Sequence, residues 1–102
     1  MLRHVVGVNL NYEKDDPRVK EFFRAAKKML ATVPEVKAYN HYVVENPECG
    51  YQYGIVLDFK SKEAWMEYNE HPDNLKFTED YWNDGVASYL FFNFLPFDES
   101  KE

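Results

Sequence analysis

Three histidines and one tyrosine are the side chains of this sequence best suited to moving protons. His4, His41 and His71 can take up or release a proton near neutral pH, and the hydroxyl of Tyr68 can donate a hydrogen bond or polarise a carbonyl group. The three histidines are far apart along the chain, and Tyr68 stands three positions before His71. Any acid–base chemistry therefore depends on a fold that brings them together.

Other common kinds of site are not indicated. Cys49 is the only cysteine, so no intrachain disulfide can form, and no histidine stands beside it in the polar segment 46–50. The histidines have no close partner at metal-ligand spacing, and the 4 glycines are scattered rather than gathered in a phosphate-binding loop. We predict no metal site, and we expect an unpaired thiol in a reducing, cytoplasmic compartment.

The charge balance argues against two classes of partner. The net charge is −6 and the pI is about 5.0. An acidic surface repels the phosphates of nucleic acids and of anionic membranes. The apolar stretch at the N-terminus is also too short for a signal peptide or a membrane span. We expect neither nucleic acid nor a membrane as partner.

Strands are predicted where apolar residues alternate with other residues, which is the period of a strand. Four segments show this alternation or a Val- and Tyr-rich composition: 2–10, 36–44, 51–59 and 86–95.

Two helical regions are predicted between these strands. Apolar residues recur every three or four positions after Asp16, which can cap a helix, and the pattern stops before Pro34. Ser61 is expected to cap the second region, which Pro72 interrupts and the segment 83–85 ends.

The resulting element order, β-α-β-β-α-β, is that of a ferredoxin-like α+β domain, with an antiparallel sheet and both helical regions on one face. His4 has the parity to point under the helices. We assign the same orientation to the strongly apolar positions Val6, Val8, Ile55, Leu57, Leu90, Phe92 and Phe94.

The opposite sheet face is predicted to be a dimer interface. It would present Val5, Val56, Tyr89 and Phe91, an apolar patch that rarely stays in water. A second copy packed face to face in two-fold symmetry would cover it. A partly wetted antiparallel sheet is the alternative.

Three segments together resemble the stress-responsive A/B barrel (Dabb) family. They are the opening segment 1–6, with a histidine after a basic residue, the strand segment 50–59, and the segment 68–77 around a His-Pro pair. The resemblance covers residues 1–97 and leaves 98–102 as a polar tail. It implies a dimeric α+β barrel, no obligatory cofactor and a small pocket between helices and sheet.

The resemblance also suggests which residues line that pocket. His4 and Tyr68 match a strand histidine and the pocket tyrosine of the family's plant polyketide cyclase, and Tyr53 and His71 match two further positions. Asn74 stands where the cyclase has its catalytic histidine, and an amide cannot act as a base. We therefore expect no cyclase reaction, and a pocket of His4, Tyr53, Tyr68, His71 and Asn74 with apolar walls from Val6 and Ile55.

Several interpretations stay open. His4 is either a buried neutral histidine or a pocket acid–base group, His71 also fits a helix cap, and Trp65 fits the core. His41 is expected at the surface or in an interface. The protein is either a ligand-binding or stress-response dimer, or a cofactor-independent enzyme acting on a small aromatic or polyketide-like compound, such as a lyase, isomerase or monooxygenase.

Overall fold

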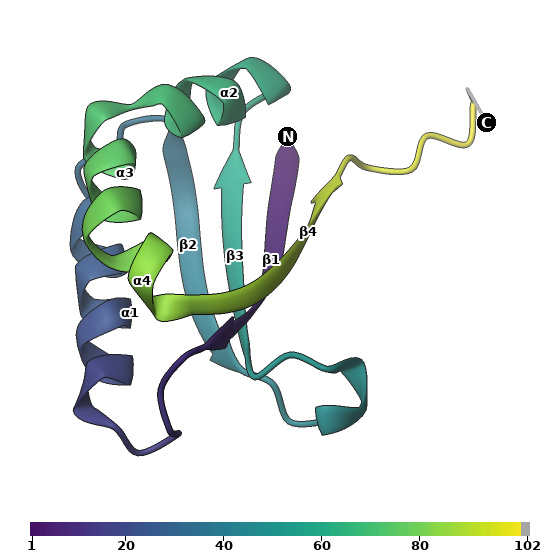
Figure 1. Cartoon of the computed structure of the whole chain (residues 1–102). Coiled ribbons are helices and arrows are strands. Elements are labelled where there is room, and N and C mark those ends of the chain that lie inside the picture. The colour runs from purple at the N-terminus through teal and green to yellow at the C-terminus, as the bar shows by residue number, and fades with distance from the viewer. Residues whose placement is uncertain (101–102) are drawn as a thin grey trace.

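A four-stranded antiparallel sheet forms the centre of the computed structural model, which describes residues 1–100 (Figure 1). The strands stand in the order β2-β3-β1-β4 and every neighbouring pair is antiparallel. This confirms the predicted ferredoxin-like fold. Their bounds are β1 (Leu2–Leu10), β2 (Val36–Val43), β3 (Tyr53–Phe59) and β4 (Val86–Phe94).

The two longest helices begin at the residues that the sequence predicts. Asp16 caps α1 (Pro17–Leu30), and its carboxylate accepts a hydrogen bond of 2.9 Å from the backbone two residues later. Ser61 caps α2 (Lys62–Glu70), and its hydroxyl accepts one of 3.2 Å from the backbone three residues later. Each side chain satisfies one amide group that the first helical turn leaves free.

The second helical region is broken at His71. This residue ends α2 and also caps α3 (Pro72–Phe77), because Pro72 has no amide hydrogen to continue the helix. A wider helical turn (Thr78–Trp82) and the short α4 (Asn83–Gly85) then lead into β4. Pro72 thus divides one expected helix into pieces that bend across the sheet.

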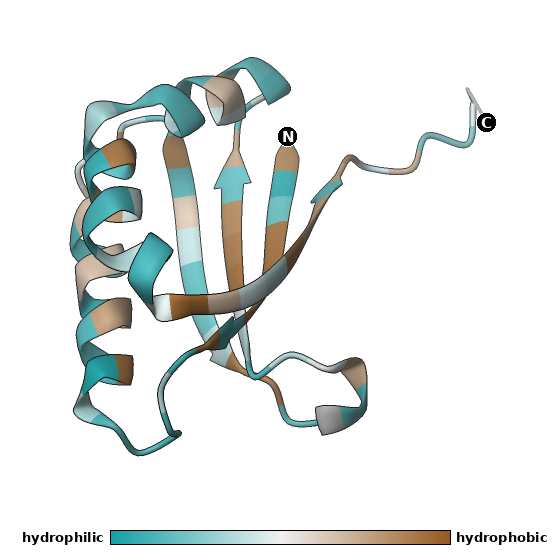
Figure 2. Ribbon diagram, in the orientation of Figure 1, coloured by the Kyte–Doolittle hydropathy of each residue, from teal (hydrophilic) through white to brown (hydrophobic). Residues whose placement is uncertain are grey.

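The helices α1 to α4 cover the same face of the sheet, whereas the single helical turn Pro47–Cys49 lies in the loop between β2 and β3, as Figure 1 shows. Along β1 and β3 buried and more exposed residues alternate, and Figure 2 shows that both strands are largely apolar. The most deeply buried large side chains are Val8 and Phe22, with Leu57 and Phe59 on β3. The core therefore lies between this face and α1.

The orientation predicted for β4 is wrong. In the register of β1 and β4, Val6 is paired with Phe91 and Val8 with Tyr89. Paired residues of antiparallel strands share a face, so Tyr89 and Phe91 lie on the helix side and Leu90 lies on the outer side. Phe92 and Phe94 also lie on the outer side, opposite to the prediction. The period-two pattern could not decide this, because both faces of β4 carry large apolar residues.

The C-terminal end of the chain extends away from the sheet. Figure 1 shows β4 curving past β1, and its residues after Val86 are exposed. The polar tail predicted for 98–102 is described as far as Ser100, and its last two residues lie outside the described residues. Within the described part of the chain, no helix is long and apolar enough to cross a membrane.

Candidate functional site

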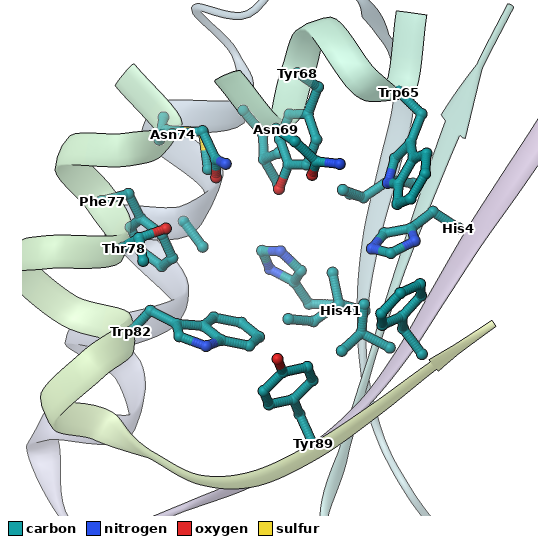
Figure 3. A pocket seen from close by; sticks show the side chains of 17 residues that line it. His4, His41, Trp65, Tyr68, Asn69, Asn74, Phe77, Thr78, Trp82 and Tyr89 are labelled. Atoms are coloured by element: carbon teal, nitrogen blue, oxygen red, sulfur yellow. The ribbon is translucent and has the colours of Figure 1, made fainter. Parts of the chain in front are cut away.

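A cavity of about 350 Å³ lies between the sheet and the helical segment that runs from α2 to Trp82 (Figure 3). All four strands contribute to its wall. Its apolar wall is formed by Val6, Ala26, Met29, Leu30, Ile55, Leu57, Phe77 and Phe91, and its aromatic or polar residues are His4, His41, Trp65, Tyr68, Asn69, Asn74, Thr78, Trp82 and Tyr89.

His4 points into this cavity from β1 and is only 8% exposed. Its Nδ1 lies 2.7 Å from Oδ1 of Asn93 on β4. Because an amide oxygen only accepts hydrogen bonds, Nδ1 donates, and Nε2 of the neutral ring is left with a free lone pair. Burial lowers the pKa of His4, although the hydrogen bond to Asn93 opposes this effect. His4 is thus an oriented neutral imidazole that can accept a proton.

His41 is a second imidazole in the cavity, and the expectation of a surface or interface position is wrong. It is paired with Ile55 across β2 and β3, so it shares the helix-facing side of the sheet. Its Nε2 is buried and has no hydrogen-bond partner. Burial, and secondarily the charge of Lys27 on α1, lower the pKa of His41. His41 and Tyr39 are two residues apart on β2 and therefore share a face of the sheet, and Tyr39 is paired with Leu57. This period of two was the sequence signal that could have placed His41 on the helix side.

Tyr68 and Trp65 reach the cavity from α2. The ring of Tyr68 packs on Phe59 with 5.2 Å between centroids, and burial raises the pKa of its hydroxyl to about 12. The hydroxyl therefore stays protonated at neutral pH and can donate a hydrogen bond. Trp65 lies 5.7 Å from His4 between ring centroids, and its Nε1 is buried without a partner. The sequence interpretation of Trp65 as a core residue missed this exposure to the cavity.

Two residues predicted for the pocket lie elsewhere. His71 caps α3, and its Nδ1 accepts a hydrogen bond of 3.1 Å from the backbone of Asp73. Tyr53 is on the correct face of the sheet, but its ring packs against Phe23 of α1, with 5.1 Å between centroids, and does not line the cavity. Tyr53 thus contributes to the contact between β3 and α1 and not to the cavity wall.

The other predicted positions divide between the two faces of the sheet. His4, Val6, Ile55, Tyr68 and Asn74, which were chosen from strand parity and family position, line the same cavity. Their role in binding a ligand stays a prediction.

Tyr89 and Phe91 also line the cavity, so their assignment to the outer face is wrong. Phe91 lies 5.2 Å from His4 between ring centroids, and Tyr89 lies 5.5 Å from Trp82. Val5 and Val56 are paired on the outer face. Their role in an interface stays a prediction.

The charged groups of the described residues do not form a metal site. No group of three or more His, Cys, Asp or Glu side chains within residues 1–100 is arranged to hold a metal ion. An ion pair on the sheet joins Arg3 and Asp58 at 2.8 Å, and neither residue lines the cavity. The chemistry of the cavity is therefore that of imidazole, phenol, indole and amide groups.

This arrangement defines an α+β ferredoxin-like domain with a cavity under its helices. The sequence belongs to the Stress responsive A/B Barrel Domain (Dabb) family, whose model matches residues 2–95. No curated protein sequence matches the chain at a significant level.

Solved structures share the fold over nearly the whole chain. A Dabb-family protein with a ferredoxin-like fold from Mesorhizobium loti has a TM-score of 0.91 and 28% identity, and the match covers 95% of this chain and 97% of that one. A dimeric ferredoxin-like protein of unknown function from Thermobifida fusca has a TM-score of 0.74 and 22% identity over 91% and 88% of the two chains. The hydroxynitrile lyase of Passiflora edulis has a TM-score of 0.79 and 14% identity over 96% and 94%.

Proposed function

We propose that this protein binds a small, mainly apolar molecule of aromatic size in the cavity beneath α2 and α3. The observation that carries the proposal is the pair of buried nitrogens without partners, His41 Nε2 and Trp65 Nε1. Buried polar atoms in folded proteins nearly always have a hydrogen-bond partner, and leaving one unsatisfied costs about 1–3 kcal/mol. Both residues line the cavity, and a ligand that shifts the side chains covering these nitrogens would satisfy them.

The size and wall of the cavity support the same function. Small-molecule sites typically have volumes of roughly 300–1,000 Å³, apolar walls and a few convergent polar groups. The cavity, at about 350 Å³, falls at the lower end of this range. Its aromatic side chains, among them Trp65, Trp82 and Phe91, offer flat faces for a ring. A single substituted aromatic ring fits this description better than an extended chain.

We infer that the protein acts as a homodimer through the outer face of its sheet. Val5 is paired with Val56 on one side and Phe92 on the other, so an apolar row crosses three strands. Leu90 and Phe94 extend this row along β4, and the three β4 side chains are 47–52% exposed. A second copy would remove this surface from water. The related proteins from Thermobifida fusca and Jannaschia are described as dimeric.

A cofactor-independent enzyme is the second candidate function. One observation favours it, which is that His4, His41 and Tyr68 face the same cavity (Figure 3). A neutral imidazole can remove a proton while a tyrosine hydroxyl donates to a carbonyl oxygen. Asn74 by itself predicts that the cavity lacks a base. His41 changes this expectation, because the cavity has basic nitrogens on its strand wall. The hydroxynitrile lyase of Passiflora edulis shows that the fold can carry a lyase.

Ligand-observed NMR with a panel of phenols, aryl ketones and alkylbenzenes tests the binding function. Ile55→Phe places a larger side chain in the cavity and should abolish binding of the compounds that bind wild type. Leu75→Phe changes an exposed residue of α3 outside the cavity wall and serves as the matched control. Circular dichroism checks that both variants fold. Undiminished binding by a folded Ile55→Phe variant would place the ligand elsewhere.

A further inference from the structure

The wall of the cavity is free of formal charge. None of its lining residues among the described positions is Asp, Glu, Lys or Arg. The pKa values of His4 and His41 are lowered by burial, and that of Tyr68 is raised by burial. All three groups are thus shifted toward their neutral forms. An ion placed here would lose its hydration without gaining a charged partner.

Trp65 gives the cavity a polar group with a fixed role. An indole N–H only donates hydrogen bonds, whereas an imidazole nitrogen donates or accepts according to its tautomer. Nε1 of Trp65 is buried and unpartnered, and Figure 3 shows it on the edge of the ring that faces the cavity. The neighbouring His4 is held by Asn93 and does not form a hydrogen bond with this indole. What Trp65 lacks is therefore a hydrogen-bond acceptor.

We propose that Trp65 is the specificity-determining residue of the cavity, and that it selects an uncharged aromatic molecule whose carbonyl oxygen accepts a hydrogen bond from Nε1. The inference rests on the proposed binding function and names its ligand class. It excludes carboxylates and phosphates as preferred ligands. It also ranks an aryl ketone, aldehyde or ester above a hydrocarbon of equal size.

A carboxylate could be matched in the cavity only if an imidazole became protonated. The groups that face His41 do not favour this, because Tyr39 and Tyr53 on the sheet and Phe23 on α1 are uncharged. The charge of Lys27 on α1 also opposes a further positive charge on His41. An ionised acid would therefore bind more weakly than its neutral analogue.

Three probes of nearly equal shape separate these possibilities: acetophenone is neutral with an acceptor, ethylbenzene is neutral without one, and benzoate is anionic. Each is titrated into the full-length protein near neutral pH, and the indole N–H signals are followed by ¹H–¹⁵N NMR. Variants Trp65→Phe and Trp82→Phe assign these signals. We expect acetophenone to move the Trp65 signal downfield and to bind about tenfold tighter than ethylbenzene or benzoate, the effect of one satisfied hydrogen bond.

The matched variants show whether Trp65 is responsible. Trp65→Phe should remove the preference for acetophenone and leave the affinity for ethylbenzene within about twofold, since the apolar wall is kept. Trp82→Phe should retain the preference. Equal affinity for benzoate and acetophenone, or a preference that survives in Trp65→Phe, would overturn the inference while the binding function stands. Binding of none of the probes would contradict the proposed function and the inference with it.

Discussion

The helices cover one face of the sheet, but the two halves of that cover are built differently. At one end of this face the space is filled, with Phe22 of α1 only 2% exposed and Val8 of β1 fully buried. At the other end a cavity remains between the sheet, α2, α3 and the last turns of α1, and none of the residues of α2 is buried. The packed half supplies stability, and the hollow half leaves room for a ligand.

The sequence explains the difference. In α1 the apolar residues recur along 14 residues without interruption, so the helix presents a continuous stripe to the sheet. The second helical region is interrupted at Pro72, which directs its parts at different angles across the sheet. Its large rings, such as Trp65 and Trp82, therefore line the cavity instead of filling it. A protein of this size can leave one half hollow only because the other half is well packed.

Truncation in the packed half should have the largest effect. Phe22→Ala removes a buried ring that contacts Phe23, Phe77 and Trp82, and it should lower the free energy of unfolding by about 3–5 kcal/mol. In the hollow half Tyr68→Phe removes a hydroxyl that faces the cavity and should change it by less than about 1 kcal/mol. Urea denaturation measures both. Equal losses in the two variants would contradict the division into packed and hollow halves.

The two faces of β4 give the next largest effect. Phe92→Asp would place an unpaired charge in the proposed interface and should weaken the dimer by about 3 kcal/mol or more, over a hundredfold in Kd. Phe91→Asp changes the adjacent residue, whose ring lies beside His4 in the cavity, and serves as the matched control. It should abolish ligand binding and keep the dimer. Light scattering at micromolar concentration measures the oligomeric state, and a monomeric wild type would rule out the interface.

The orientation of β4 also shows where sequence reasoning failed. The order of the elements, both helix caps and the break at Pro72 follow from local chemistry and were predicted correctly. Along β1 one parity is clearly more apolar, so its faces could be assigned. Along β4 both parities are apolar, and a shift of one residue exchanges them. The hydrogen bond between His4 and Asn93 would have fixed the register, but it joins residues 89 positions apart.

Only part of the cavity wall was predicted, again because the faces of a strand cannot always be assigned from its own sequence. Parity placed His4, Val6 and Ile55 correctly, and the family resemblance suggested Tyr68 and Asn74. His41 was missed because β2 alternates weakly and its faces are settled only by pairing with β3. Likewise, Tyr53 lies on the correct face of β3 but packs against Phe23 of α1 and does not line the cavity. Volumes between elements cannot be read from the periodicity of each element alone.

A smaller effect should appear in the pH dependence of stability. Burial lowers the pKa of His4 below its ordinary value of 6.5, so the unfolded chain binds this proton more readily than the folded one. Stability should therefore fall as the pH drops through 6.5 toward the lower pKa of the folded state, and it should be fully present above 6.5. His4→Phe removes this group and should make that part of the curve shallower, while the lowered pKa of His41 accounts for the slope that remains. Urea denaturation at several pH values measures the difference.

The hydrogen bond to Asn93 allows a check within the same site. It raises the pKa of His4, in opposition to burial, so Asn93→Ala should lower the pKa further. NMR titration of the imidazole signals measures this shift directly. A pKa that rises in Asn93→Ala would show that the ring has gained access to water, and that burial no longer governs its protonation.

The smallest effect is expected for polyketide cyclisation, where wild type should show no rate above background. The reaction needs a base that removes a carbon-bound proton and a donor that polarises the carbonyl group. Tyr68 can donate, but Asn74 stands at the position of the base in the plant cyclase. His4 and His41 stand on the sheet wall instead, so the cavity has no imidazole at the position of the cyclase base. General base catalysis contributes roughly a hundred- to ten-thousand-fold, so Asn74→His should bring the rate into a measurable range if the rest of the site suffices.

Wild type and Asn74→His are assayed side by side on a linear polyketide thioester. Turnover by wild type that His41→Phe abolishes and Asn74→Ala retains would show that the strand imidazole is the base. The hollow half would then be an active site in its own right, with its acid–base groups on the sheet.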